Sequence, residues 1–524
     1  DNSENNNDQK VTFLKSETIF DIEEEIINQY LENIKTIKSK TIHREFVKIL
    51  SNLELEGQQN IDNKVYVIIK KLYEMGEIGK AYNLVKKLNL NNISKQENLD
   101  FFYFIELNYL YSTFKLSEVC ELKSLLLNES IKLPNYLLEK SDIFCLTLEN
   151  KYAEAKLLNS LLLESEKSTD QNFQNLFNYM ILNEKDVKSF DPLSEIKSKE
   201  LIFLYSAMLR INELALDKDF IEVDPLNLLI PVILSESTDM DVRIKAANNA
   251  YFDEVLSINS LSALYQSVDF NSKQFNNPKE TIVSLNNNKE LIMAFYYQLV
   301  NIQIFPDERL EVILDYWKFA KMSGLQKIAY AITEKTIDTF TPTSENTQYG
   351  MEIALAYISN RNFNEALKWI NLYENNNLEN DKLEYVKFLI EINETDELDT
   401  IIKYLSDNYK NFNNLKNQNT LESFEVLIKF LNIEDISPPD LFYKNILDTR
   451  PMPSYFLLRD INNNINDVNN LEMFLLSLIS INNKNWTELH PEHLKLILVA
   501  YNLYDNGFLI KSIILEILNE LEIF

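Results

Sequence analysis

Glycine is scarce in this chain: there are 6 in 524 residues, where an average usage of about 7% would give several times as many. Sheet proteins and nucleotide-binding enzymes need glycine in tight turns, bulges and phosphate-binding loops. Proline is also scarce, with 12 residues, so long stretches run without either helix breaker. The chain can contain few glycine-dependent turns, and the composition therefore predicts a mostly helical protein.

Motifs for nucleotide binding and nucleophilic hydrolysis are missing from the sequence. It contains no GxxxxGK[ST], GxGxxG or GxSxG, and its only closely spaced glycines, Gly76 and Gly79, fall in a predicted turn. The run 460–472 resembles a calcium-binding loop, but Ile465 stands at the position that requires glycine and Leu471 stands at position 12. No cofactor is predicted.

Positive charge is in short supply, with 51 basic residues against 80 acidic ones and a formal net charge of −29. Such a surface repels phosphate backbones and anionic membranes, so no nucleic-acid partner is expected. No apolar run reaches the roughly 18 to 20 residues that cross a bilayer, and the best candidate, 226–234, is short and contains Pro231. The charge instead predicts a partner protein or peptide with a basic patch.

Cysteine and histidine are too few for a metal framework. Cys120 and Cys145 are either two buried small side chains or one disulfide, since the predicted hairpins place them on neighbouring helices. His490 and His493 lie three residues apart, but a metal site needs a third ligand, and Glu492 between them does not lie on the same face of the helix. His490 is better interpreted as the cap of a helix that begins at Pro491. No metal site and no catalytic residue are predicted.

Helical hairpins explain most of the N-terminal third. Apolar residues recur at helical spacing over 65–73 and 78–88, and again over 99–114 and 116–127. A third pair follows in the stretch 144–164, with a polar turn at 149–151 and with Pro134 near the first turn of its leading helix. The residues after the three turns are Ile78, Leu116 and Tyr152, separated by 38 and 36 positions, and three residues later come Ala81, Val119 and Ala155. This period is typical of helical-repeat arrays, with an aromatic or aliphatic residue filling the gap between two helices and a small residue at their close crossing.

Aromatic and acidic residues are abundant enough to suggest sites by chance. The aromatic run 101–111 is interpreted as core between helices rather than as the lining of a groove. Glu129 next to Ser130 is reminiscent of the acid of superhelical glycan-cleaving enzymes, but the glycine-bearing catalytic domain of those enzymes has no counterpart here.

The predicted organisation has five parts. These are a disordered segment 1–15, regular helical-hairpin repeats 16–190, less regular helical repeats 191–435, a proline-containing joint 436–456 and a C-terminal helical cap 457–524. Helix boundaries are expected at the proline-containing pairs 191–192, 224–225, 277–278 and 305–306. The predicted fold class is all-α, an α-solenoid of stacked helical hairpins.

Two resemblances support this architecture. The segment 350–373 resembles the tetratricopeptide repeat in the positions of Ala354, Tyr357, Ala366 and Ile370, although the leading Trp and closing Pro of that motif are missing. The segments 141–163 and 261–278 are similar to uncharacterised exported helical proteins of alphaproteobacteria, some of which carry an "antifreeze" label. The second resemblance implies a cleaved signal and a periplasmic location, but no activity.

The chain begins with Asp1, which fits a removed secretory signal and fits a chain shortened for expression equally well. A periplasmic location is expected, with the cytoplasm as the alternative. The predicted function is that of a non-enzymatic scaffold or adaptor, which binds a partner on a curved helical-repeat surface. The alternative is an envelope enzyme or enzyme subunit that uses a pair of carboxylates.

Overall fold

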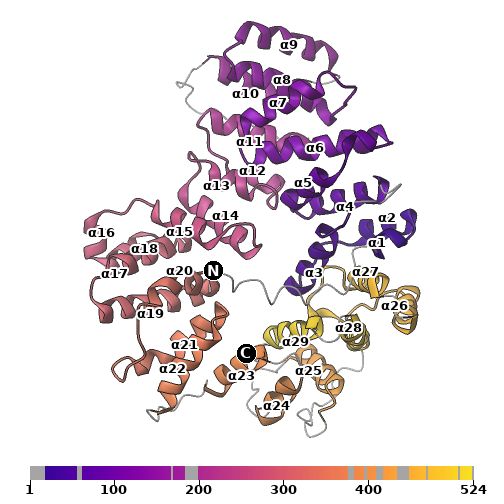
Figure 1. Ribbon diagram of the computed structural model, residues 1–524. Coiled ribbons are helices and arrows are strands. Elements are labelled where there is room, and N and C mark those ends of the chain that lie inside the picture. Colours follow the sequence, from indigo (N-terminus) through magenta and orange to yellow (C-terminus); the bar gives the residue numbers. More distant parts are fainter. Residues whose placement is uncertain are drawn as a thin grey trace. The chain divides into compact units, whose positions relative to one another are not determined.

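The computed structural model describes residues 18–55, 62–166, 169–182, 199–375, 383–394, 398–408, 417–433, 448–467, 470–504 and 508–521 (Figure 1). Helices and their connecting turns make up these ranges, and no strand occurs within them. The predicted all-α class is therefore confirmed for the described residues. The segment 1–15, the proline pair 191–192 and most of the predicted joint 436–456 lie outside them.

The chain folds into two compact units. One is formed by Asp1–Met75 and Asn380–Phe524, and the other by Gly76–Glu379. The first unit contains α1 (Thr18–Asp21), α2 (Glu24–Asn33), α3 (Lys40–Ser51), α4 (Asp62–Glu74), α23 (Leu383–Glu394), α24 (Asp399–Asn408), α25 (Gln418–Phe430), α26 (Tyr455–Asp467), α27 (Asn470–Ile481), the 3-10 helix η7 (Trp486–Glu488), α28 (Pro491–Tyr504) and α29 (Phe508–Glu520). This division groups the chain differently from the predicted parts, because the N-terminal helices belong with the C-terminal ones.

The second unit holds the remaining helices. They are α5 (Ile78–Lys87), η2 (Leu90–Asn92), α6 (Gln96–Ser112), α7 (Leu116–Leu126), η3 (Pro134–Tyr136), α8 (Leu137–Leu148), α9 (Tyr152–Ser165), α10 (Gln171–Leu182), η4 (Lys199–Leu201), α11 (Ile202–Ile211), α12 (Lys218–Val223), α13 (Leu229–Leu234), α14 (Met240–Phe252), α15 (Ile258–Gln266), α16 (Ser272–Asn276), α17 (Pro278–Ser284), α18 (Lys289–Ile302), α19 (Pro306–Met322), α20 (Gln326–Ile337), η5 (Thr347–Tyr349), α21 (Gly350–Ser359) and α22 (Phe363–Asn375). Most of them pack against helices that are next or nearly next to them in the chain.

The helix boundaries follow the sequence signals closely. The three described proline pairs all mark helix ends: α12 stops before Pro225, and α17 and α19 begin at Pro278 and Pro306. Proline is tolerated there because the first residues of a helix donate no intrahelical hydrogen bond. The small residues at the predicted crossings, Ala81, Val119 and Ala155, have exposed fractions of 0%, as does Ala366 in the segment that resembles the tetratricopeptide repeat.

The aromatic residue after the turn at 149–151 was predicted wrongly. Tyr152 does not fill the gap between α8 and α9, because its side chain is 40% exposed and its hydroxyl donates a hydrogen bond to Asn150 Oδ1 over 2.8 Å. Local hydrogen bonding at the turn thus turns the ring outward. The buried Ala155 carries the contact instead.

Left-handed residues end many of these helices, although glycine is scarce. Positive φ angles of 55° to 61° occur at Phe114, Asn150, Glu213, Glu254, Arg361 and Asn432. In three hairpins the next amide closes the turn onto a carbonyl five residues back: Lys115 to Leu110 and Lys151 to Leu146 over 2.9 Å, and Asn362 to Tyr357 over 2.8 Å. This is a common C-terminal helix cap, in which glycine is usual. The chain therefore makes these turns mostly with residues other than glycine.

The turn at Phe114 shows why a large residue can stand at such a position. The guanidinium of Arg210 stacks on the Phe114 ring, with 3.7 Å from its central carbon to the ring centroid. The contact connects the turn between α6 and α7 to α11, which also packs against α6. The cation–π contact offsets part of the strain of the left-handed backbone.

Arg361, which is exposed at the turn before α22, allows a test of the strain that a residue other than glycine has in the left-handed conformation. The variant Arg361→Gly is expected to raise the free energy of unfolding by up to about 1 kcal/mol, because glycine has no Cβ to clash in the left-handed region. Urea denaturation measures the change. Asn432→Gly is the control with a smaller expected gain, since asparagine already tolerates this conformation. Loss of stability in the Arg361 variant would contradict the argument.

Candidate functional site

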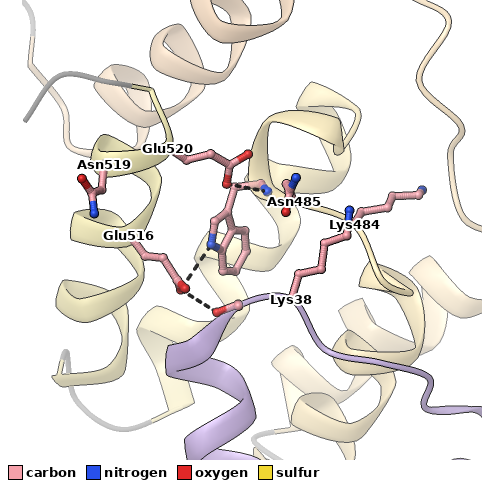
Figure 2. A pocket seen from close by; sticks show the side chains of 8 residues that line it. Lys38, Lys484, Asn485, Glu516, Asn519 and Glu520 are labelled. Atoms are coloured by element: carbon pink, nitrogen blue, oxygen red, sulfur yellow. Dashed lines mark hydrogen bonds between the residues drawn. The ribbon is translucent and has the colours of Figure 1, made fainter. Parts of the chain in front are cut away.

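The candidate site is a polar cavity of about 300 Å³ in the unit that contains both ends of the chain. Its lining comes from the segment before α3, from the segment around η7 and from α29 (Figure 2). The lining residues are Lys38, Ser39, Lys484, Asn485, Trp486, Glu516, Asn519 and Glu520. Helices α3 and α29 pack against each other, as do α2 and α27, so the cavity lies where the N-terminal and C-terminal segments meet.

Glu516 holds this junction together. One of its oxygens, Oε2, accepts hydrogen bonds from the Ser39 hydroxyl over 2.5 Å and from Trp486 Nε1 over 3.4 Å. The other, Oε1, accepts the backbone N–H of Lys40 over 2.9 Å. Lys40 is the first residue of α3, so the carboxylate stabilises an unpaired amide at the positive end of a helix.

Glu520, one helical turn further along α29, does the same for η7. Its two oxygens accept the backbone N–H groups of Trp486 over 3.0 Å and Thr487 over 2.9 Å. The Thr487 hydroxyl also donates to it. Trp486 thus bonds both glutamates, Glu520 through its backbone N–H and Glu516 through its indole Nε1, and Figure 2 shows Glu516 and Glu520 on the same helix beside the cavity. Both carboxylates are thus committed to structural hydrogen bonds, which is not the arrangement of a general acid and base that must reach a substrate.

The rim of the cavity carries two lysines. Lys38 forms an ion pair with Glu488 over 3.1 Å, and Lys484 donates to the Pro451 carbonyl over 3.2 Å. Glu488 also accepts the Asn485 N–H over 2.6 Å, which closes a capping box on η7. The arrangement provides hydrogen-bond donors and acceptors for a small polar group, and its main chemical role is to fix the two chain segments.

Replacing Glu516 by alanine is expected to lower the free energy of unfolding by about 2 kcal/mol, because three donors lose their acceptor, among them the first backbone N–H of α3. Hydrogen exchange of the first turn of α3 should accelerate as well. The matched control is Asn519→Ala, an exposed residue of the same cavity, which should change stability by less than about 0.5 kcal/mol. Equal effects of the two variants would show that Glu516 does not hold the junction.

Arg450 extends this network beside the cavity. Its exposed fraction is 7%, and its Nε donates to both oxygens of Asp448 over 3.0 Å. The same guanidinium pairs with Glu422 on α25. Hydrogen bonding from Arg450 lowers the pKa of the Asp448 carboxyl to about 2. Asp448 is therefore ionised near neutral pH and compensates the positive charge of Arg450.

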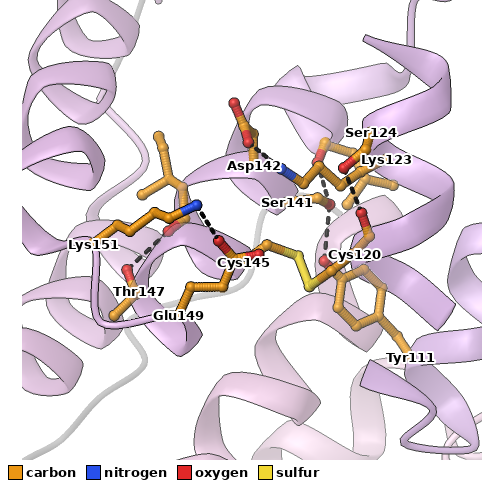
Figure 3. Close-up of a disulfide and its surroundings, with 12 residues drawn as sticks. Tyr111, Cys120, Lys123, Ser124, Ser141, Asp142, Cys145, Thr147, Glu149 and Lys151 are labelled. Atoms are coloured by element: carbon orange, nitrogen blue, oxygen red, sulfur yellow. Dashed lines mark hydrogen bonds and ion pairs between the residues drawn. A yellow bond between two sulfur atoms is a disulfide. The ribbon is translucent and has the colours of Figure 1, made fainter. Parts of the chain in front are cut away.

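The two predicted disulfide residues lie together in the other unit. Cys120 on α7 and Cys145 on α8 form a disulfide with 5.7 Å between their Cα atoms (Figure 3). Polar contacts between α6, α7 and α8 surround it: Lys123 pairs with Asp142 over 2.5 Å, and the Tyr111 hydroxyl donates to Ser141 over 2.8 Å. The cross-link therefore connects two consecutive predicted hairpins.

The two clustered histidines have separate roles. His490 Nδ1 accepts the backbone N–H of Glu492 over 3.3 Å at the start of α28, as the capping interpretation predicted. His493 is fully buried, and its Nε2 lies 2.9 Å from the Ser480 hydroxyl. Within the described residues no group of three histidine, cysteine, aspartate or glutamate side chains could hold a metal ion.

Burial lowers the pKa of His493 to about 4, and the positive charges of Lys484 and His490 add to the shift. An unfolded histidine has a pKa of about 6.5, so between these values the unfolded chain binds more protons than the folded one. Stability from this group is complete above pH 6.5 and is lost as the pH falls towards 4. We expect a loss of about 2 kcal/mol between pH 7 and pH 5, seen as a lower urea midpoint. In His493→Gln, whose amide can still bond Ser480, this part of the pH dependence should disappear.

Three further features singled out in the sequence do not form a functional site in the structure. Glu129 is exposed after the end of α7, the run 460–472 is helical in its described part, and Gly79 lies inside α5 rather than in a turn. Of the aromatic run 101–111, Phe102, Phe104 and Tyr111 are buried core, as predicted, while Phe101, Tyr103 and Tyr109 are half-buried.

A buried ionic cluster surrounds Lys140, and the sequence patterns did not predict it. Lys140 on α8 has an exposed fraction of 1%, and its Nζ lies 2.8 Å from both Glu166 Oε1 and Asp170 Oδ2. The Tyr205 hydroxyl on α11 donates to Asp170 over 2.6 Å, and burial together with that carboxylate raises the pKa of Tyr205 above its usual value. A signal was available, because Lys140 stands between Leu137 and Phe144 on the apolar side of its helix.

Comparison with known proteins gives no relatives: no protein-family model matches the chain, and neither a curated protein nor a solved structure does. The resemblances to tetratricopeptide repeats and to exported alphaproteobacterial proteins therefore stay predictions. No described helix has the length and apolarity needed to cross a membrane.

Proposed function

We propose that the protein is a non-enzymatic scaffold or adaptor, which binds a partner protein or peptide on the surface of stacked helical hairpins in a solenoid like that of tetratricopeptide repeats. The observation that carries this proposal is the recurrence of one packing unit. The hairpins α6–α7, α8–α9 and α21–α22 share the same left-handed turn and a fully buried small residue three positions into the second helix. Repeated hairpins of this kind bury a continuous core and leave a long surface for recognition.

The negative charge of the chain indicates a partner with a positively charged surface. With a formal net charge of −29, a binding surface attracts a protein or peptide that carries a basic patch, and the association is steered electrostatically. The geometry of the polar cavity supports a binding role over catalysis, because Glu516 and Glu520 are both engaged by backbone and side-chain donors.

The location that we propose is the bacterial cell envelope. Disulfides form and persist in oxidising compartments such as the bacterial periplasm, and the Cys120–Cys145 disulfide supports such a place. The similarity of segments 141–163 and 261–278 to exported helical proteins agrees with it.

Affinity capture tests this function. The full chain, tagged and immobilised, is incubated with extract of the native cells at low and at moderate ionic strength, and captured proteins are identified. The expected partner has a basic surface, and its affinity, measured with both purified proteins, falls by at least about tenfold between roughly 50 and 300 mM salt. Binding that is indifferent to salt, or capture of no reproducible partner, would contradict the proposal.

A further inference from the structure

Helix α9 packs against α8 (Figure 1), and its Asn159 side chain bonds Gln174 on α10. The helix carries leucines on the side that faces these neighbours and on the opposite side. Its buried residues are Ala155, Asn159 and Leu162. Leu157 and Leu161, however, have exposed fractions of 63% and 52%. Because successive residues of a helix are rotated by about 100°, these two leucines lie on the side opposite the buried three.

Acidic residues stand at both ends of this apolar stretch. Glu154 lies three positions before Leu157, and Glu164 lies three positions after Leu161, and both glutamates are exposed. The four residues follow one another at spacings of 3, 4 and 3, which keeps them on one side of the helix. We call this set, Glu154, Leu157, Leu161 and Glu164, the α9 stripe.

We propose that the α9 stripe docks an amphipathic helix of the partner, one that carries two apolar residues four positions apart with a lysine or arginine three positions outside each of them. The two leucines would pack between the apolar residues of that helix, and its basic residues would meet the two glutamates. This deepens the proposed function and rests on it, since it gives the adaptor a docking surface and its partner a chemistry.

The charges decide among the possible occupants of the stripe. A second copy of the chain would pair Leu157 with Leu161 in an antiparallel arrangement, which brings Glu154 against Glu164 and opposes two like charges at each end. Each copy also carries a net charge of −29, which adds long-range repulsion. An anionic lipid surface is repelled in the same way, whereas a helix with flanking basic residues complements the stripe at both ends.

The test uses the full chain and a synthetic peptide as the probe. The probe is a fluorescent, capped peptide of roughly 18 residues, rich in alanine and glutamine, with the pattern Lys-x-x-Leu-x-x-x-Leu-x-x-Lys. Its control has the same composition and charge, but the leucines stand on opposite sides of the helix. Fluorescence anisotropy is expected to show at least about tenfold tighter binding of the probe than of the control. Equal binding of both peptides would reduce the interaction to charge alone and overturn the proposal.

Matched variants then locate the binding site. Leu157→Ser combined with Leu161→Ser should weaken probe binding by about tenfold or more, and its thermal unfolding should be unchanged because both side chains are exposed in the parent protein. The control is Leu503→Ser, whose side chain is 49% exposed on α28 in the other unit and which should leave the affinity unchanged. If the double variant binds the probe as the parent does, the proposal is wrong.

Two further outcomes separate this proposal from the proposed function. If a natural, salt-sensitive partner is captured but binds the double variant with unchanged affinity, the adaptor function stands and the α9 stripe fails. If light scattering shows a dimer that dissociates in the double variant, or if neutral vesicles bind the parent and not the variant, the stripe has a different occupant from the one proposed. If the capture experiment yields no reproducible partner, the proposed adaptor function is contradicted, and the α9 stripe as its docking surface is contradicted with it.

Discussion

Replacing Lys140 by alanine is expected to lower the free energy of unfolding by about 3 to 5 kcal/mol, the largest effect of any single substitution considered in this chain. The ammonium group is 2.8 Å from both Glu166 and Asp170, and it donates to the Asn135 carbonyl over 3.0 Å. Without it, carboxylates that are almost removed from water lose their counter-ion. The Tyr205 hydroxyl that binds Asp170 then faces an unpaired charge.

Urea unfolding monitored by circular dichroism measures this change. Asp170 also accepts the Phe173 N–H at the start of α10, so hydrogen exchange in α10 should accelerate together with the loss of stability. The matched control is Lys156→Ala on the neighbouring helix α9, an exposed lysine whose removal should change stability by less than about 0.5 kcal/mol. Similar values for the two lysine variants would mean that the buried cluster does not stabilise the fold.

A second variant distinguishes the loss of the ion pairs from the loss of side-chain volume. Lys140→Met keeps a long flexible side chain but leaves the same carboxylates without a partner, so it should be nearly as damaging as Lys140→Ala. Adding Asp170→Asn to Lys140→Met removes one of the stranded charges and should recover part of the stability. A double variant less stable than Lys140→Met alone would contradict this explanation.

Short-range structure was predictable because its causes are local. The periodicity of apolar residues placed α6 to α9 within a few residues, and prolines at 225, 278 and 306 marked helix ends. The small residues Val119 and Ala155 were correctly assigned to buried crossings. The same local pattern could not give the direction of the Tyr152 ring, which depends on one hydrogen bond to Asn150.

Contacts between distant segments were not predictable from these patterns. Nothing in the sequence of α3 indicates that Glu516 on α29 accepts its first backbone N–H, since the two partners are 476 positions apart. The candidate cavity was missed for this reason. Lys140 could have been suspected from its place on an apolar side of a helix, but its partners Asp170 and Tyr205 come from other helices. Periodicity identifies a buried charge and leaves its counter-ion unknown.

Loss of the Cys120–Cys145 disulfide is expected to lower the free energy of unfolding by about 3 kcal/mol. The two cysteines are 25 positions apart, so the cross-link closes a loop that includes the second half of α7, η3 and most of α8. An unfolded chain restricted in this way has less conformational entropy to gain, which favours the folded state. The double variant Cys120→Ser with Cys145→Ser should show the loss in urea unfolding, and reduction of the parent protein should match it.

Thiol titration decides whether this prediction applies to the protein as it is made in the cell. Protein exported to the envelope and purified without reductant should show no reactive thiol even in denaturant, and two after reduction. The same chain expressed in a reducing cytosol should show two thiols and the lower stability of the serine variant, since glutathione and thioredoxin keep cytosolic cysteines reduced. If the exported protein carries two free thiols, the disulfide is absent from the natural form. The stability difference between parent and serine variant should then be small, because serine would replace two unlinked thiols.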